Sequence, residues 1–403
     1  MSSGFGIGEI RIDSLKVGSV DLTGTQATQS GFEVFENIFS SYGPAAEINV
    51  VDPTDAASQL KGGEDVEIRF SDANGLGVVG FKLKSFMSKN LSDRLTDNQG
   101  SLKNKQYTIR AVSVEALNAQ GNYVDKSWDD KTTNMSKNVL EKYYNTDKQI
   151  DIEENSKDKR IFRAQNEHPR KILQKLNDEH VGTSSKSSAF AVFQEQENGN
   201  QKYKITTFEK LFEKGSVGKW AQREDLDSSN VTGNDRLYSL IWFEAGENFN
   251  MATDHTKKAN ENTFNLSTHS PSAPKPQQTK FKTLGSPVRE TAQYANSVPV
   301  SKALSMVNEK QKTEASTAKA NKTQFLSHLA ENSASFEIIG NPKVKLGCVM
   351  DLDIPKKVAD GGGKERQFNG KVCVVEIRHK IRPAGQVPRY TMVIRAVKAA
   401  YEG

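Results

Sequence analysis

The chain has six histidines, and none stands at a spacing that builds a metal site or a nucleophile. They are His168, His180, His255, His269, His328 and His379. The sequence has no His-Glu-x-x-His, Cys-x-x-Cys or Gly-x-Ser-x-Gly motif, the patterns through which metalloproteases, zinc sites and serine hydrolases place their reactive groups. We therefore predict no catalytic residue, no cofactor-binding residue, no metal ligand and no cofactor.

Three further patterns resemble a site without meeting its requirements. Asp351 and Asp353 are two residues apart, so in a strand both carboxylates face one side, but a solvated strand face explains them better than an acid pair. Residues 361–364, Gly-Gly-Gly-Lys, lack the remaining positions of a phosphate loop, which predicts a hairpin tip. The glycines at 4, 6 and 8 precede the first predicted strand, whereas a dinucleotide fingerprint follows one.

Runs with a two-residue apolar period lie near both ends of the chain. Near the C-terminus they cover residues 344–354, 371–381 and 390–397, and near the N-terminus 65–70, 80–86 and 107–112. The last run of each group has a similar sequence, Tyr-Thr-Ile-Arg-Ala-Val at 107–112 and Tyr-Thr-Met-Val-Ile-Arg-Ala-Val at 390–397. We infer two related antiparallel barrels or sandwiches, although any two half-buried sheets share this period, which leaves an unrelated pair open.

The intervening sequence predicts a mixed α/β region. Pro169 at a first helical position opens a helix with Ile172, Leu173 and Leu176 on one face. A second helix is expected around 139–143 and a hairpin over 189–206, while the charged run 151–160 is expected to be a solvated face or loop. The stretch 269–320 is rich in Pro, Ala and Ser, which predicts an extended insertion or linker.

Four apolar residues near the N-terminus follow a different spacing. Phe32, Phe35, Ile38 and Phe39 stand three and four apart, as on one face of a short helix. We expect a helix or an extended element whose aromatic side packs into the core of the first sheet.

Length and composition limit the class of protein. A chain of 403 residues is longer than the size at which a single hydrophobic core stops growing, so two to four domains are expected. Lys and Arg exceed Asp and Glu by 55 − 50 = +5, which argues only weakly for contact with a polyanion. The sequence shows neither an export leader nor an apolar run of about 18 residues, so we expect a protein that is neither secreted by a signal peptide nor embedded in a membrane.

The two cysteines, Cys348 and Cys373, fall in two predicted strands of the terminal sheet. A small apolar side chain suits either inward position, so we expect reduced core residues. A disulfide between neighbouring strands is the alternative.

The C-terminal residues carry a resemblance to a known family. A helix over 322–331, the run Phe-Glu-Ile-Ile-Gly-Asn-Pro at 336–342, a Gly-rich loop, and the strands at 369–379 and 390–392 look like the contractile-tail baseplate hub family. This family includes the phage late control D proteins and the hub portion of type VI secretion spikes. The run 168–173 ahead of the hairpin is similar to the central domain of the same family.

The resemblance implies a mainly β (α+β) fold. It has two related β-barrel tube-type domains, at 1–120 and at 226–268 with 321–403, an α/β hub domain at 121–225, and the insertion at 269–320. It also implies a homotrimer that forms a pseudo-six-fold ring in the virion tail baseplate, assembled in the bacterial cytoplasm. Such a hub joins the hexameric tail tube to the trimeric membrane-puncturing spike and lets DNA or effector cargo pass. The implied partners are spike and tube proteins, with tape-measure and baseplate wedge proteins as further candidates, no membrane, and DNA only in transit.

Two other classes of function remain as alternatives. Tail hubs sometimes carry lytic domains, so a tail-associated cell-wall hydrolase is one, and it would need a carboxylate or histidine site in a cleft. A nucleic-acid-binding β-barrel is the other, and it would need aromatic and basic side chains interleaved on one strand face. The absence of catalytic motifs favours a structural protein that is not an enzyme.

Overall fold

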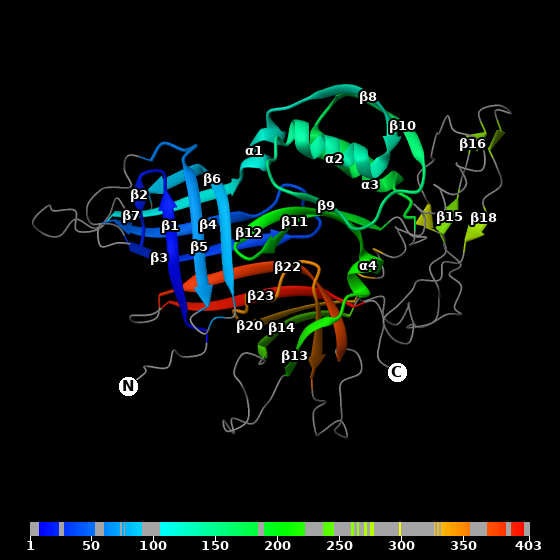
Figure 1. Ribbon diagram of the computed structural model, residues 1–403. Helices are drawn as coiled ribbons and strands as arrows, with labels where there is room; N and C mark the ends of the chain where they lie inside the picture. The colour runs from blue at the N-terminus through cyan, green and yellow to red at the C-terminus, as the bar shows by residue number, and fades with distance from the viewer. Residues whose placement is uncertain are drawn as a thin grey trace, which may run out of the picture.

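The strands from both ends of the chain join in one large sheet. A computed structural model describes residues 8–23, 28–52, 60–72, 75, 77–90, 105–183, 189–221, 237–245, 326, 329, 332–354, 369–383 and 388–398, with short strands between 259 and 299. The described part is mainly β with a few helices, in line with the predicted fold class (Figure 1). In this part of the chain, no helix is long and apolar enough to cross a membrane.

Seven strands come from the N-terminal part. They are β1 (Ile10–Val17), β2 (Val20–Asp21), β3 (Thr28–Asn37), β4 (Ala45–Asp52), β5 (Asp65–Asp72), β6 (Val78–Asn90) and β7 (Lys105–Ser113). The strands predicted at 65–70, 80–86 and 107–112 are confirmed as β5, β6 and β7. Alternate side chains of β4 and β5 are buried, as the two-residue period requires.

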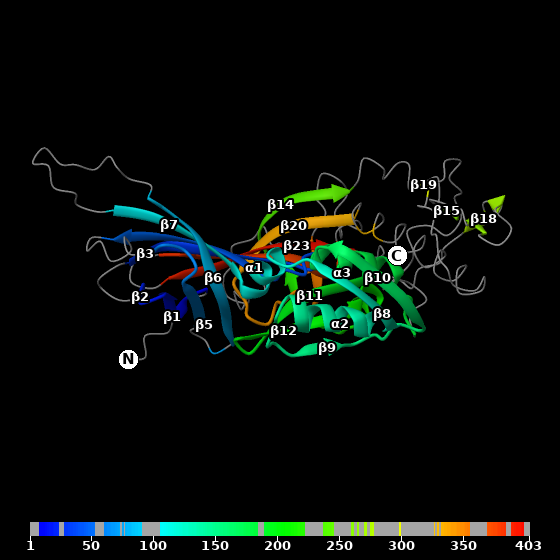
Figure 2. The same cartoon turned by 90° about the horizontal axis from the view of Figure 1, so that it is seen from above.

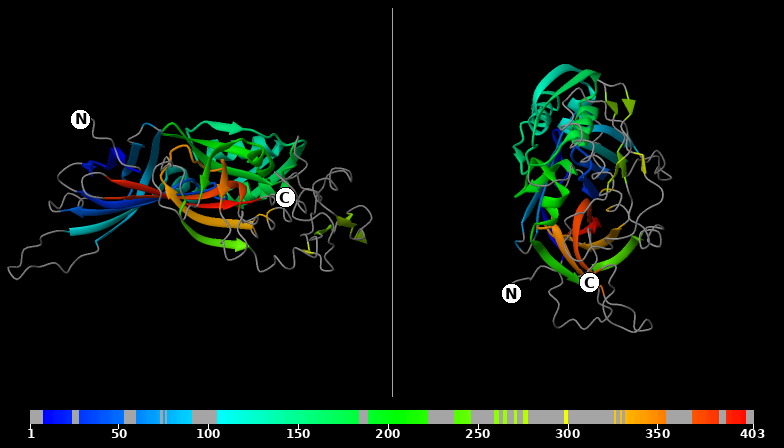
Figure 3. Two further views of the ribbon diagram at one scale, coloured as in Figure 1. Left: turned by 90° about the horizontal axis from the view of Figure 1, so that it is seen from below. Right: turned by 90° about the vertical axis from the view of Figure 1, so that its right-hand side faces the viewer.

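The C-terminal part adds six strands to the same sheet. They are β13 (Ser216–Ala221), β14 (Leu237–Ala245), β20 (Asn332–Ile339), β21 (Val349–Asp353), β22 (Gly370–Arg382) and β23 (Arg389–Val397). The order is β14-β20-β23-β22-β3-β4-β7-β6-β5-β1-β2, and β21 pairs with both β22 and β13. Figures 2 and 3 show β23 between the blue N-terminal strands and the orange β20.

Strands β3 and β22 form the seam between the two sets of strands. They pair antiparallel from Ile381 opposite Phe32 to Glu376 opposite Asn37. A second contact is an isolated bridge between Glu9 and Arg389, at the starts of β1 and β23. One continuous hydrophobic core underlies both sets, so the seam is an interior part of the fold.

The middle of the chain has its own core. Its elements are α1 (Val114–Gln120), β8 (Val124–Lys131), α2 (Thr132–Tyr143), β9 (Ile150–Ile152), β10 (Lys159–Glu167), α3 (Pro169–Glu179), β11 (Phe190–Glu197), β12 (Asn200–Thr207) and α4 (Phe208–Phe212). Figure 1 shows α2 and α3 above the large sheet, beside the β8–β10 ribbon. Both predicted helices are confirmed, with Pro169 at the start of α3 and Ile172, Leu173 and Leu176 buried.

The predicted hairpin is confirmed as β11 and β12, and it fixes the middle part against the sheet. Its two-residue turn, Asn198-Gly199, has positive φ at both positions, as a type I′ turn requires. The turn sits on Gly80 of β6, where an added Cβ would lie 2.3 Å from the Gly199 carbonyl oxygen. Gln196 donates from Nε2 to the Gly80 carbonyl at 2.8 Å. A glycine at position 80 is therefore required for this approach.

Five short strands lie in the remaining chain: β15 (Ala259–Glu261), β16 (Phe264–Asn265), β17 (Ser270–Pro271), β18 (Lys275–Gln277) and β19 (Val298–Pro299). They pair among themselves in two small ladders. Apart from β17, β18 and β19, the predicted insertion at 269–320 lies outside the described residues. Of the predicted helix over 322–331, positions 326 and 329 are described, and both are helical.

The helical spacing at residues 32–39 was misleading, because this stretch is the strand β3 and the turn after it. In a strand alternate residues share a face, so Phe32 and Val34 are buried while Phe35 and Phe39 are 39% and 56% exposed. The extended alternative is correct, and the prediction of one core-facing aromatic side is wrong for Phe35 and Phe39.

The predicted strand over 344–354 is shorter than expected. Only β21, Val349–Asp353, is a strand, because Gly347 has φ +72° and backbone hydrogen bonds close turns at Val344 and Cys348. The apolar side chains at 344 and 346 are still buried. Cys348 thus lies outside the strand and Cys373 within β22, and both are free thiols.

The run 151–160, predicted to be a solvated face or loop, contains a loop between β9 and β10, but part of this loop is buried. Glu154 is 1% exposed and pairs with Lys210 at 2.9 Å, and Glu153 pairs with Lys204 at 2.9 Å. Burial raises the pKa of Glu153, but its hydrogen bond to Lys204 and the positive charges of Lys214 and Lys204 together outweigh this effect and lower the pKa to about 2. Buried charges of this kind are stabilised by ion-pair partners, and the charge pattern of the sequence alone does not reveal those partners.

Candidate functional site

The structure places the described histidines in structural positions. His168 begins α3 and packs edge-on against Tyr123. His180 is fully buried, with ring nitrogens next to the hydroxyls of Thr132 and Ser136. His379 is also buried, and its environment is described below. His255, His269 and His328 lie outside the described residues.

His379 forms a buried polar group across the seam. Its Nε2 lies 2.8 Å from Glu36 Oε2 on β3, and its Nδ1 lies 2.7 Å from the Tyr390 hydroxyl on β23. All three side chains are at most 5% exposed. Burial raises the pKa of Tyr390 well above its usual value, so this hydroxyl stays protonated. The group is closed to solvent, which makes it a link between strands instead of a reaction site.

The other patterns that resembled a site do not assemble one. Asp351 and Asp353 are half-exposed on β21, and Asp353 pairs with Lys219 at 2.8 Å. Residues 361–364 and 1–7 lie outside the described residues. Among the residues that the structure describes, no three His, Cys, Asp or Glu side chains gather as a metal site would require.

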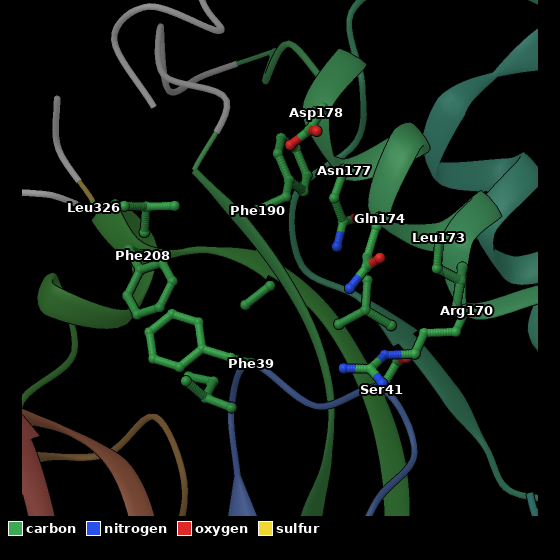
Figure 4. A pocket seen from close by; sticks show the side chains of 13 residues that line it. Phe39, Ser41, Arg170, Leu173, Gln174, Asn177, Asp178, Phe190, Phe208 and Leu326 are labelled. Carbon is green, nitrogen blue, oxygen red and sulfur yellow. The ribbon is translucent and has the colours of Figure 1, made fainter. Parts of the chain in front are cut away.

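A pocket of about 140 Å³ opens where α3, β11, α4 and the turn after β3 meet (Figure 4). It is lined by Ile38, Phe39, Ser41, Arg170, Leu173, Gln174, Asn177, Asp178, Phe190, Ala191, Val192, Phe208 and Leu326. Asp178 is the one carboxylate among these lining residues, whereas hydrolysis of a glycosidic bond ordinarily takes two. At its mouth, Phe39 stacks on Phe208 with ring centroids 5.6 Å apart.

The largest functional candidate is a polar sheet face that crosses the seam. Along β3, β4, β22 and β23 one face is buried in the core and the opposite face is half-exposed or exposed. We call this opposite face, from β20 to β7, the polar face. Its charged side chains are Glu33, Glu47, Arg110, Glu337, Glu376, Arg378, Lys380, Arg382, Arg389 and Arg395.

Three arginines of the polar face are paired with glutamates. Arg110 Nε lies 3.0 Å from Glu47 Oε2, and Arg378 donates to Glu33 from Nε at 2.7 Å. Arg395 lies 3.9 Å from Glu376, whose other neighbour is the Asn37 amide at 2.8 Å. Arg378 also stacks over Phe35, at 4.8 Å from the ring centroid. Alternating charge along neighbouring strands therefore ties the seam together on its exposed side as well.

Sequence reasoning missed this face, although a signal was present. Glu376, Arg378 and Lys380 alternate with buried positions in a run that was predicted to be a strand. Their partners could not be found because residues 32–39 were assigned a helical spacing, which hid the alternation of Glu33 and Phe35. Register between strands far apart in sequence is a tertiary property, which no local pattern supplies.

Solved structures match nearly the whole chain by fold, whereas the searches by sequence found no match. No protein-family model and no curated protein matches it. The 43 kDa tail protein of prophage MuSo2 from Shewanella oneidensis is 11% identical, with a TM-score of 0.57 over 96% of this chain and 98% of its own. The tail protein from Neisseria meningitidis MC58 is 9% identical, with a TM-score of 0.59 over 97% and 96%.

A type VI secretion system component from Escherichia coli is 10% identical, with a TM-score of 0.49 over 97% of this chain and 76% of its own. At these identities the likeness concerns the fold alone, and of these three structures the two tail proteins exceed a TM-score of 0.5. The chain thus has the fold of phage tail proteins.

Proposed function

We propose that the chain is the structural hub of a contractile-tail baseplate, as its sequence resemblance suggests. Three copies form a pseudo-six-fold ring that joins the hexameric tail tube to the trimeric spike. The observation that carries the proposal is the sheet that continues through the β3–β22 seam, because it presents two sets of strands as one surface. The shared fold with two tail proteins over nearly their whole length supports it.

The two strand sets are alike in a way that suits a pseudo-six-fold ring. In each set a 13-residue strand with a register shift, β6 or β22, is followed by a nine-residue strand, β7 or β23. Two similar units in each of three chains present six similar surfaces to a hexameric tube. We propose that these units are the tube-type barrels at 1–120 and at 226–268 with 321–403, with β13 added to the second through its pairing with β21.

In this arrangement the α/β part at 121–225, without β13, is the hub domain that meets the spike. The hairpin turn on Gly80 and a part-buried hydrogen bond from the Tyr203 hydroxyl to the Ser41 carbonyl, at 3.1 Å, hold it against the first strand set. The polar face lines the bore of the ring. The segment at 269–320 is an insertion or linker, and the chain is a component of the virion tail baseplate, which is assembled in the host bacterial cytoplasm.

We propose a structural role and no enzymatic one. The pocket in Figure 4 has walls of mixed polar and apolar side chains with one carboxylate, and the buried His379 group has no access to substrate. A zymogram with peptidoglycan tests this part, since a cleared zone from the pure chain would establish a hydrolase instead.

The assembly role is tested with particles made without this chain. We expect tails that lack an assembled baseplate in electron micrographs, and restoration by the wild-type chain supplied in trans. Normal infectious particles in the absence of the chain would refute the hub proposal. A spike protein that fails to co-purify with the full chain, under conditions where the tube protein does, would refute the adaptor role.

A further inference from the structure

The polar face carries more cations than its ion pairs use. Its six described basic side chains face four glutamates. Three arginines are paired with glutamates, as described above, and the remaining cations are Lys380, Arg382 and Arg389. These three gather at the turn between β22 and β23, so the surplus lies at one end of the face.

The two arginines at this end stand directly opposite each other. Arg382 and Arg389 are cross-strand neighbours, both are exposed, and neither forms an ion pair with a described carboxylate. Glu33 lies across from Lys380, and Glu9 bridges Arg389 through the backbone, without an ion pair to either cation among the described residues. Like charges placed directly opposite destabilise a sheet, so a counter-charge from outside the chain would relieve this end.

The middle of the polar face has the opposite character. Arg110, Arg378 and Arg395 are 51%, 45% and 37% exposed, which leaves them within reach of a large ligand. Each one is nevertheless occupied by a glutamate, and a paired guanidinium offers a phosphate little net charge. Because affinity for nucleic acid depends on the number of phosphates neutralised, this region should add almost nothing to binding.

We propose that the polar face is graded for a nucleic acid backbone: the unpaired arginines at the β22–β23 end attract it, and the glutamate-paired arginines beyond do not hold it. This inference rests on the proposed function, in which the face lines a bore. It adds a physical reason why a polyanion could enter the ring and still slide. Removing the glutamates should convert a passage into a binding surface.

The test measures binding of a short fluorescein-labelled DNA duplex to the full chain by anisotropy, over a range of salt concentrations. The variant Arg382→Gln/Arg389→Gln should bind about tenfold more weakly at low salt, with a salt slope shallower by about 2. The variant Glu33→Gln/Glu47→Gln/Glu376→Gln should bind at least about tenfold more tightly, with a slope steeper by about 3. Circular dichroism establishes that each variant is folded.

A matched control removes three carboxylates from other surface ion pairs. Glu141→Gln, Glu167→Gln and Glu197→Gln remove ion-pair partners of Lys137, Lys175 and Lys202 in the α/β part, so the net charge changes equally away from the polar face. This control should stay within about threefold of the wild type.

Two results would overturn the proposal: a glutamate variant that binds no tighter than the control, or an arginine variant that binds as tightly as the wild type. Native mass separates this inference from the hub itself. A trimer without the DNA responses refutes the graded face alone, whereas a chain that shows these responses and stays a monomer even with the spike protein refutes the ring and leaves the graded face standing.

Discussion

The buried group at the seam gives a sharp prediction about stability. Glu36 on β3, His379 on β22 and Tyr390 on β23 are joined by contacts of 2.8 and 2.7 Å inside the common core. Phe70 and Phe81 pack edge-on against the imidazole, so water has no room to replace a lost partner. The contact between Glu36 and His379 therefore couples the two strand sets, while Tyr390 holds the imidazole from within the C-terminal set.

Replacing Glu36 with Leu should cost about 3–5 kcal/mol of unfolding free energy. The imidazole would stay buried, at 2% exposure, without its acceptor, and removing one member of a buried polar pair carries this penalty. His379→Leu should cost a similar amount, because the carboxylate would then be buried alone. The double variant should lose only about 1–3 kcal/mol, mostly from the unpaired Tyr390 hydroxyl, since an apolar pair replaces the polar one.

The assay is urea denaturation followed by tryptophan fluorescence, with unfolding free energies from linear extrapolation. A double-mutant cycle then gives the coupling between Glu36 and His379, for which we expect at least about 3 kcal/mol. Glu33→Gln is the control, because it changes a half-exposed carboxylate of the same strand and should cost about 0–1 kcal/mol. A cost below about 1 kcal/mol for Glu36→Leu, or additive single variants, would refute the reasoning.

Three further predictions concern other parts of the chain. The low pKa of Glu153, about 2, contributes stability above pH 4.5 that is lost as the pH falls towards 2. Glu153→Gln should therefore reduce the dependence of the unfolding free energy on pH in this range, and an unchanged pH dependence would contradict this. Gly80→Ala should displace the hairpin turn, lower the unfolding free energy by roughly 1–3 kcal/mol and lower the thermal midpoint by several degrees. Gly215→Ala should do neither, because a Cβ at position 215 would meet no atom within 4 Å. Burial raises the pKa of the fully buried Cys373 well above its usual value and that of the half-buried Cys348 to about 12, so iodoacetamide should label Cys373 only after the chain unfolds and Cys348 slowly. Rapid labelling of Cys373 in the native chain would contradict its burial.

Local patterns predicted the strands and helices well wherever burial follows a strict period. The stretch at 371–381 alternates polar and apolar residues and became β22, and Pro169 marked the start of α3. Both features are decided by residues close in sequence, through the pleat of a strand and the fixed φ of proline.

The predictions failed where tertiary contacts decide the outcome. Phe35 and Phe39 have helical spacing, but pairing of β3 with β4 and β22 holds the stretch extended and turns both rings outward. Glu153 and Glu154 look like a solvated run, but Glu153 pairs with Lys204 of β12, and the buried Glu154 pairs with Lys210 of α4. The polar face was missed for the same reason, because its Arg378–Glu33 ion pair joins strands more than 300 residues apart in sequence.

Native mass measured at several concentrations tests the central claim of a ring most directly. One chain has a mass of 44.6 kDa, so a closed three-fold assembly has 3 × 44.6, or about 134 kDa. The hub account predicts this mass for the full chain, alone or once the spike protein is added. A chain that stays at the monomer mass in both cases would contradict it.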